Sequence, residues 1–202
     1  MRKITINLAA VAAFCIVVAS PALVSSSCAT PKTEQEDTTI IREDSGITAL
    51  KYSSPEVPAS IEFCGKTIDL SRFDRHERMD RELLAFTYMH STSLQMLKKA
   101  NRYFPIVEPI LKENGIPDDF KYLMVIESNM NPTARSSAGA AGLWQFMQGT
   151  GRDYGLEVNN NVDERYHIEK ATRAACRYLK DLFAIYNDWS LAIAAYNCGP
   201  GN

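Results

Sequence analysis

One glutamate stands where the sequence could support acid–base chemistry. Glu127 directly follows the apolar run Leu123–Ile126 and precedes a segment rich in Asn, Pro, Ser and Gly. A carboxyl where an apolar helix meets a loop is partly removed from water, which raises its pKa and suits it to general-acid catalysis. The same position also fits a glutamate that ends a helix and points to solvent, and position alone favours that second interpretation.

The other reactive side chains indicate neither a metal site nor a nucleic-acid interface. His76, His90 and His167 are scattered without metal-ligand spacing and no Cys-x-x-Cys pair occurs, so we predict no metal and no other cofactor. Cys176 and Cys198 fit a disulfide as well as two thiols packed as small apolar groups. The 22 basic and 24 acidic residues give a net charge of −2, which excludes the strongly basic surface typical of nucleic-acid binding.

Three further segments follow Glu127-Ser128 in a fixed order. They are Ala134-x-Ser136-x-x-Gly139-Ala140-x-Gly142-Leu143-Trp144-Gln145-Phe146-Met147-x-x-Thr150, Asp163-Glu164-Arg165 and Ala195-Tyr196-Asn197-x-Gly199-Pro200-Gly201. Each segment is weak by itself. In this order and at these spacings they resemble the family 1 lytic transglycosylases, particularly the membrane-bound murein transglycosylase D type. The resemblance covers residues 73–202 and is strongest from residue 116 onwards.

The resemblance implies an all-α, lysozyme-like domain of the goose-type lysozyme and lytic transglycosylase fold, which cleaves the glycan strands of peptidoglycan. In that family the glutamate matching Glu127 protonates the glycosidic oxygen and then deprotonates the C6 hydroxyl of the muramic acid. That hydroxyl attacks C1 of its own sugar, so the β-1,4 bond between MurNAc and GlcNAc breaks and a 1,6-anhydro-MurNAc end forms. An internal nucleophile needs no second carboxyl, although the sequence leaves Asp153 and Asp163 open as partners.

Four substrate contacts also follow from the resemblance. Ser136 matches the serine that contacts the N-acetyl group near the reacting sugar. Gln145 matches the glutamine that hydrogen-bonds the glycan in the groove. Phe146 and Met147 would line the cleft. Without the ordered match, ordinary packing or solvent contact would be the preferred interpretation of all four.

The last motif and its neighbours complete the expected site. Tyr196 matches the tyrosine whose hydroxyl bonds and orients the catalytic carboxyl, and Asn197 supports the same wall. For Trp144 we favour core packing over sugar stacking, because part of a short helix there must face inward. Asp163 and Arg165 are expected to form a structural ion pair, which contributes little if it is exposed.

Helices have to position these segments, since apolar residues recur at helical spacing from about residue 75 onwards. Asn114-Gly115 should end one helix with a left-handed residue, and Asp188 should cap the start of the last one. Gly and Ser between 131 and 142 predict a loop. We expect helices over about 75–101 and 105–114, a third that starts after Pro117 and carries Glu127, a short one from 143 to before 151, and two more over 167–186 and 188–195.

The first 27 residues have the pattern of a secretory signal peptide. Met1-Arg2-Lys3 precedes an uncharged apolar stretch over 8–19, which is short for a membrane span. Small residues before Cys28 resemble a lipoprotein signal, in which Cys28 is lipidated and anchors the chain to a bilayer. The position three residues before Cys28 is usually Leu or Val in such signals and is Ser25 here, so cleavage as an ordinary secretory signal peptide is the alternative. We predict a periplasm-facing protein of the cell envelope, either an outer-membrane lipoprotein or a protein secreted to the periplasm.

Between the signal and the helices lies an acidic, proline-punctuated segment. We predict that residues 28–72 form a polar tether, because four basic and eight acidic residues over 30–70 leave little apolar surface to bury. A short strand pair around Gly65 is expected within it. Residues 73–202 are expected to be the catalytic domain, and family members continue with further helix, so we expect this domain to be incomplete at its C-terminus.

Two alternatives to the transglycosylase remain at this point. One is an envelope protein that binds peptidoglycan without turnover, which the end of the sequence directly after the last motif favours. The other is a muramidase on the same fold that hydrolyses the same bond with water. The presence of both Glu127 and Tyr196 favours an enzyme.

Overall fold

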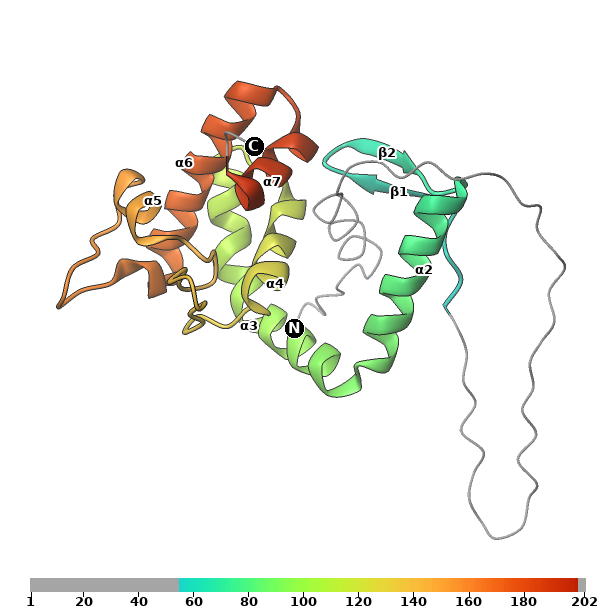
Figure 1. The fold of residues 1–202 in the computed structure, drawn as a ribbon, viewed down its shortest axis with the longest axis horizontal. Coiled ribbons are helices and arrows are strands. Elements are labelled where there is room, and N and C mark those ends of the chain that lie inside the picture. The colour runs from blue at the N-terminus through green and yellow to red at the C-terminus, as the bar shows by residue number, and fades with distance from the viewer. Residues whose placement is uncertain (1–54, 200–202) are drawn as a thin grey trace, which may run out of the picture.

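The computed structural model describes residues 55–199, drawn as coloured ribbon in Figure 1. The predicted signal peptide, Cys28 and the last two residues of the final motif lie outside the described residues. The predicted all-α class is confirmed, because the only sheet among residues 55–199 has two short strands. One core lies within the helices α3 (His90–Glu113), α4 (Leu123–Ser128), α6 (Ile168–Tyr186) and α7 (Trp189–Cys198), and α2 (Phe73–Tyr88) lies beside them (Figure 1).

The two strands, β1 (Ser60–Phe63) and β2 (Lys66–Asp69), form an antiparallel hairpin. The turn residues Cys64 and Gly65 both have positive φ, 48° and 73°, as a two-residue turn that follows the strand twist requires. The strand pair expected around Gly65 is therefore confirmed. The paired residues are Ser60 with Asp69, Ile61 with Ile68, Glu62 with Thr67, and Phe63 with Lys66.

Residues 55–72 are folded against the helices, which corrects the expectation of a polar tether for this part of the chain. Phe63 is buried in the main core, and the backbone N–H of Cys64 donates to the Asp119 carboxylate at 2.8 Å. Lys66 forms an ion pair with Asp188, directly before α7. Composition was misleading here, because alternating apolar side chains in β1 are buried and each contributes about 1.5–3 kcal/mol.

The helices α2 and α3 replace the pair expected over 75–101 and 105–114. The helical backbone is interrupted at Met89, whose ψ is 48°, between α2 and α3. The helix α3 then continues through Pro105 and Pro109 without interruption. An internal proline removes a backbone hydrogen bond and costs about 3 kcal/mol or more. Packing offsets this loss, because α3 buries Ala100, Tyr103, Phe104, Val107, Ile110 and Leu111. The predicted interruption between residues 101 and 105 followed from the low helix propensity of proline alone, without the packing of α3.

The remaining long helices begin and end much as predicted. Gly115 has φ 67° and follows α3 as the expected left-handed residue. A short 3₁₀ turn, η1 (Asp118–Tyr122), leads into α4. Asp188 caps α7 by accepting hydrogen bonds from two backbone N–H groups of its first turn. The helix α6 covers the range predicted over 167–186, and the face that it buries includes Ala171, Ala175, Leu179 and Leu182.

The short helix expected from residue 143 begins later than predicted. It is α5 (Gln148–Asp153), and a tight turn precedes it. Ala141 and Phe146 close this turn with two backbone hydrogen bonds of 3.0 and 3.2 Å. Gly142 and Gln145 have φ 79° and 47°, left-handed values that a right-handed helix excludes.

Arg165, in the 3₁₀ turn η2 (Glu164–Tyr166), holds this turn in place. Its guanidinium donates to both carboxylate oxygens of Asp163, at 2.9 and 2.7 Å. It also donates to the carbonyl oxygens of Gly139 and Phe146, at 2.8 and 2.9 Å. The predicted ion pair is thus buried on the arginine side, with Arg165 5% exposed and the Asp163 side chain 25% exposed. Removing Asp163 would leave the buried guanidinium without its charge partner, which is destabilising.

Gly142 is needed where the turn meets Arg165. A Cβ added to Gly142 would lie 2.0 Å from the Arg165 carbonyl oxygen. We expect Gly142→Ala to lower the free energy of unfolding by about 2–4 kcal/mol, from a left-handed alanine and this clash. Gly139→Ala is the matched control, because its φ is 90° and no described atom lies within 4 Å of the added Cβ. Urea unfolding should show a loss of only about 1–2 kcal/mol for the control; equal losses would contradict the argument.

Candidate active site

Glu127 lies in the last turn of α4, at the junction that the sequence indicated. The preceding residues Leu123–Val125 are buried. The helix ends at Asn129, and both Asn129 and Met130 have left-handed φ, 49° and 51°. The chain therefore turns sharply after Ser128, and the carboxyl is left half-buried between the apolar helix and the loop.

Burial raises the pKa of the Glu127 carboxyl to about 7. Burial is the whole cause within residues 55–199: no described charge contributes, and no described residue donates a hydrogen bond to the carboxyl. An acid with a pKa near 7 is partly protonated at neutral pH, so it can donate a proton and, once ionised, accept one. This behaviour separates Glu127 from a glutamate that points to solvent.

Ser128 connects α4 to the turn over 141–146. Its hydroxyl lies 3.0 Å from the carbonyl oxygens of Met124 and Leu143. On the other side, Lys99 of α3 donates to the carbonyl oxygen of Asn129 at 2.9 Å. Sequence reasoning placed Ser128 in a motif but gave it no role. The sequence feature that pointed to Ser128 was its position beside Glu127. Its contacts identify it as a residue that positions the turn.

Tyr196, on α7, lies near Glu127 but does not bond it. Burial, and then the charge of Glu127, raise the pKa of Tyr196 well above its ordinary value. Its hydroxyl donates to the carbonyl oxygen of Trp144 at 2.8 Å, which corrects the expected hydrogen bond to the carboxyl. The Tyr196 ring packs against those of Phe146 and Tyr178, with centroids 6.3 and 5.1 Å apart.

Ser136, Gln145 and Asn197 each bond within their own segment. The Ser136 hydroxyl oxygen accepts from the Ala140 N–H at 3.0 Å. The Gln145 amide nitrogen donates to the Gly142 carbonyl oxygen at 2.8 Å. Asn197 is exposed, and its amide nitrogen donates to the carbonyl four residues earlier at 3.2 Å. All three therefore have a structural contact whether or not they bind substrate.

The aromatic residues of the turn face the core. Phe146 is 2% exposed, so it packs under the site instead of lining an open cleft as expected, whereas Met147 is 45% exposed. Trp144 is fully buried and its indole nitrogen donates to the Thr172 hydroxyl at 2.9 Å. The preference for core packing of Trp144 is confirmed, although α6 holds the ring and no helix begins at residue 143.

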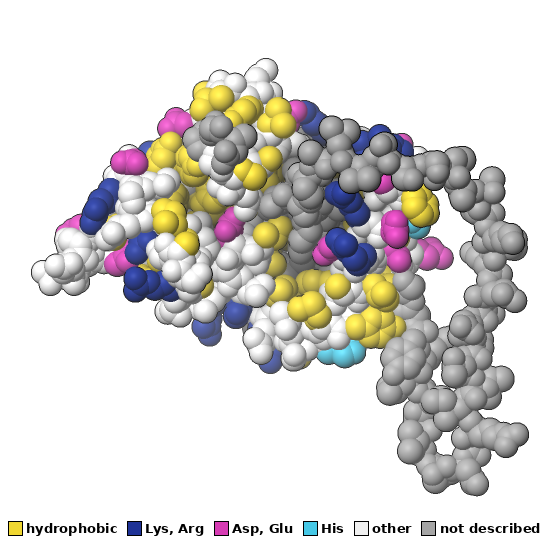
Figure 2. All heavy atoms as spheres, in the orientation of Figure 1, with side chains coloured by type: hydrophobic (Ala, Val, Ile, Leu, Met, Phe, Trp, Pro, Cys, Tyr) yellow, Lys and Arg dark blue, Asp and Glu magenta, His cyan; other side chains and the backbone are white. Residues whose placement is uncertain are grey.

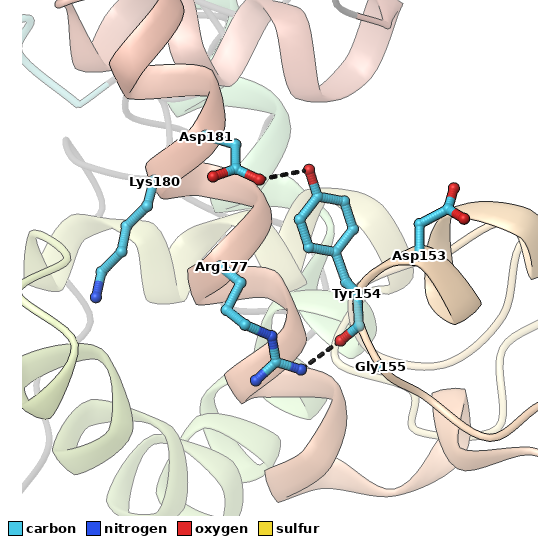
Figure 3. Close-up of a pocket in the computed structure, with 6 residues that line it drawn as sticks. All are labelled: Asp153, Tyr154, Gly155, Arg177, Lys180 and Asp181. Atoms are coloured by element: carbon cyan, nitrogen blue, oxygen red, sulfur yellow. Dashed lines mark hydrogen bonds between the residues drawn. The ribbon is translucent and has the colours of Figure 1, made fainter.

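Neither alternative carboxyl acts on Glu127. The hydrogen bond from Arg165 lowers the pKa of Asp163, so this carboxylate is committed to the ion pair. Asp153 lies at a separate open depression, where the Tyr154 hydroxyl points at Asp181 and donates to it at 3.0 Å (Figure 3). Neither group contributes to the pKa shift of Glu127. The described residues thus offer one acid at this site.

The described residues contain neither a candidate metal site nor a disulfide. Among residues 55–199, no three His, Cys, Asp or Glu side chains lie so that they could hold a metal ion. Cys176 is buried and Cys198 is exposed, and no disulfide joins them. The bridge left open from the sequence is therefore excluded, and the buried-thiol interpretation holds for Cys176.

Comparison with known proteins agrees with this geometry. Residues 105–202 match the family described as the transglycosylase SLT domain. The matched residues begin within α3 and include Glu127, the turn held by Arg165, and the described part of the last motif, so they cover the whole site. The predicted lysozyme-like helical fold is confirmed with it.

Two relatives carry informative names. The chain is 34% identical to the membrane-bound lytic murein transglycosylase D of Escherichia coli K12 over 126 residues. This alignment covers 62% of this chain and 27% of that protein. Over 91 residues it is 35% identical to the peptidoglycan transglycosylase gp16 of Escherichia phage T7, which is 44% of this chain and 7% of that protein. The chain thus spans about a quarter or less of the length of these relatives.

The raised pKa of Glu127 makes a prediction about stability. Its ordinary pKa is 4.5 and its folded pKa about 7, so the folded state binds the extra proton and loses stability as pH rises between those values. Glu127→Gln removes this loss. We expect the variant to be about 1–3 kcal/mol more stable than wild type at pH 8, with the advantage gone at pH 4.

Urea unfolding at both pH values measures this difference. Glu77→Gln, at an exposed position on α2, is the matched control and should change stability little at either pH. An advantage of Glu127→Gln that is the same at pH 4 and pH 8 would contradict a buried, titrating carboxyl.

Proposed function

We propose that the chain is a peptidoglycan lytic transglycosylase, which cleaves the β-1,4 bond between MurNAc and GlcNAc and leaves 1,6-anhydro-MurNAc ends in cell-wall turnover. The observation that carries the proposal is a single half-buried acid, Glu127, whose pKa is raised to about 7 by burial between α4 and the loop that follows it. The names of both relatives describe transglycosylases of murein or peptidoglycan. The expected substrate is the glycan strand of peptidoglycan.

The reaction needs one group that gives a proton and later takes one back. Protonated Glu127 donates its proton to the glycosidic oxygen as the bond from that oxygen to C1 breaks. The resulting carboxylate removes the proton of the C6 hydroxyl, whose oxygen bonds to C1 of the same sugar. Glu127 ends as it began, and no water is consumed. A pKa near 7 favours both halves of this cycle at neutral pH.

Residues around Glu127 are assigned positioning and binding roles in this proposal. Tyr196 holds the wall of the site through the Trp144 carbonyl. The Ser136 hydroxyl oxygen already accepts from a backbone N–H, so its own proton can be donated to the N-acetyl carbonyl of the sugar. The Gln145 amide oxygen, which accepts no hydrogen bond from a described residue, is assigned to a glycan hydroxyl. Other proposed glycan contacts are the exposed Met147 and Asn197.

The two alternatives predict different products. A muramidase would release sugars one water heavier than the anhydro form, and it would need a second carboxyl or an activated water. A binding protein would release nothing. Mass spectrometry of the soluble products from purified sacculi separates the three outcomes. The absence of a second carboxylate acting on Glu127 in residues 55–199 favours the transglycosylase.

We expect Glu127→Gln to lose about 10²–10⁴-fold in turnover on purified sacculi, because an amide of the same shape cannot exchange protons. Glycan binding should be retained, since a neutral amide is easier to bury than a carboxylate. Asp153→Asn is the matched control and should release wild-type amounts of anhydro product. A Glu127→Gln variant with more than about a tenth of wild-type turnover, or an inactive Asp153→Asn variant, would overturn the single-acid mechanism.

We further propose that the protein works in the cell envelope, facing the periplasm, as an outer-membrane lipoprotein anchored at Cys28, with secretion to the periplasm as the alternative. The small residues before Cys28 and the membrane-bound relative support an anchor. No helix within residues 55–199 is long and apolar enough to cross a membrane.

Cys28→Ala should move the protein from the membrane fraction to the soluble fraction and remove the mass of the acyl chains, since two or more acyl chains give stable anchoring. Cell fractionation and mass spectrometry of the mature protein measure both. Cys64→Ala, a cysteine of the described hairpin, is the control and should leave both unchanged. Unaltered mass and membrane partitioning in Cys28→Ala would exclude the lipid anchor.

A further inference from the structure

Exposed apolar side chains gather where α2 turns into α3. Five large ones lie within 14 residues, and we name this set the apolar corner: Leu84, Tyr88, Met89, Leu94 and Leu97, exposed by 36% to 54%. Figure 2 shows apolar side chains clustered at the lower edge of the molecule, over this turn. Single exposed apolar residues are ordinary on a protein surface, whereas a contiguous group marks an interaction site.

The α3 side of the apolar corner carries only cations, whereas Asp80 and Glu82 precede Leu84 on the α2 side. Residues 83–107 contain no Asp or Glu but three cations, Lys98, Lys99 and Arg102, in a chain of net charge −2. Lys98 and Arg102 are exposed. With Gln95 and Lys99 they line an open depression on α3, directly beyond Leu94 and Leu97. An apolar stripe flanked by cations on a helical surface is the pattern of interfacial membrane binding.

We propose that the apolar corner docks the domain on the surface of an anionic phospholipid bilayer. Met89 and Leu94, the tip residues, enter the boundary between head groups and acyl chains, and Lys98 and Arg102 face the lipid phosphates. The inference does not depend on the proposed transglycosylase activity, because none of these residues belongs to the site around Glu127.

Charge favours a bilayer over a second copy of the chain. A symmetric dimer centred on the α3 side of the apolar corner would bring the cations of one copy against the same cations of the other, since residues at a two-fold axis meet themselves. Like charges placed together oppose association. Lipid phosphates are negatively charged, so they would attract Lys98 and Arg102, whose side chains would lie at the level of the head groups.

The experiment uses the full chain carrying Cys28→Ala, so that no acyl chain contributes to binding. Sedimentation with vesicles of phosphatidylcholine alone, or with added phosphatidylglycerol, measures the bound fraction. We expect tighter binding to the anionic vesicles, which salt weakens. Lys98→Gln with Arg102→Gln should weaken this binding about fivefold for each charge removed. Met89→Glu with Leu94→Glu should weaken it at least about tenfold.

Matched controls carry the same changes elsewhere on the surface. Ile185→Glu with Leu191→Glu alters two residues that are 63% and 52% exposed, and Lys112→Gln with Lys180→Gln removes two exposed cations. Both should bind vesicles like the parent. Circular dichroism confirms that each variant folds.

Three results would overturn the proposal. The first is a parent that does not bind anionic vesicles, and the second is equal binding by the corner variants and the parent. The third is concentration-dependent self-association of the parent that Met89→Glu with Leu94→Glu abolishes, without any vesicle binding, since that result would assign the apolar corner to a second copy. Sacculus digestion by the same variants should be unchanged, so a failure here is distinct from a failure of the proposed activity.

Discussion

The site depends on the hydrogen bonds that the buried guanidinium of Arg165 donates. It joins one carboxylate and two carbonyl oxygens from three separate stretches of the loop, and this loop has little regular structure of its own. With the turn held, the Trp144 carbonyl can meet the Tyr196 hydroxyl and the Leu143 carbonyl can meet Ser128. Arg165 does not act on substrate, yet these contacts place the turn beside the acid.

The burial of Glu127 lowers the stability of the folded protein at neutral pH. Burying an ionisable group without a charge partner or hydrogen bond opposes folding at neutral pH, and this is also what brings its pKa to about 7. Of the five non-glycine residues with positive φ among residues 55–199, Asn129 and Met130 follow the helical turn of Glu127, and Gln145 lies in the turn that Ser128 contacts through Leu143. Strained backbone gathers at functional sites because the surrounding packing can maintain it.

Much of this arrangement was predictable from the sequence, and the misses share one cause. Helical spacing identified the range of α6, and residue preferences identified the Asp188 cap and the Gly65 hairpin. The predictions that were wrong depended on partners far along the chain. The break between α2 and α3, the turn before α5 and the Trp144 partner of Tyr196 are all decided by packing or by hydrogen bonds to distant residues. The ordered motifs located Glu127, but its environment required the fold.

The helix α3 connects the apolar corner with the loop beside Glu127. Its N-terminal turns carry Leu94 and Leu97, and Lys99, two residues after Leu97, bonds the carbonyl of Asn129, two residues after Glu127. One helix therefore contributes to both the apolar corner and the support of the loop. A lipid at Cys28 would keep the domain near the membrane without orienting it. Docking through α3 would add an orientation, and with it a constant position of Glu127 relative to the bilayer surface.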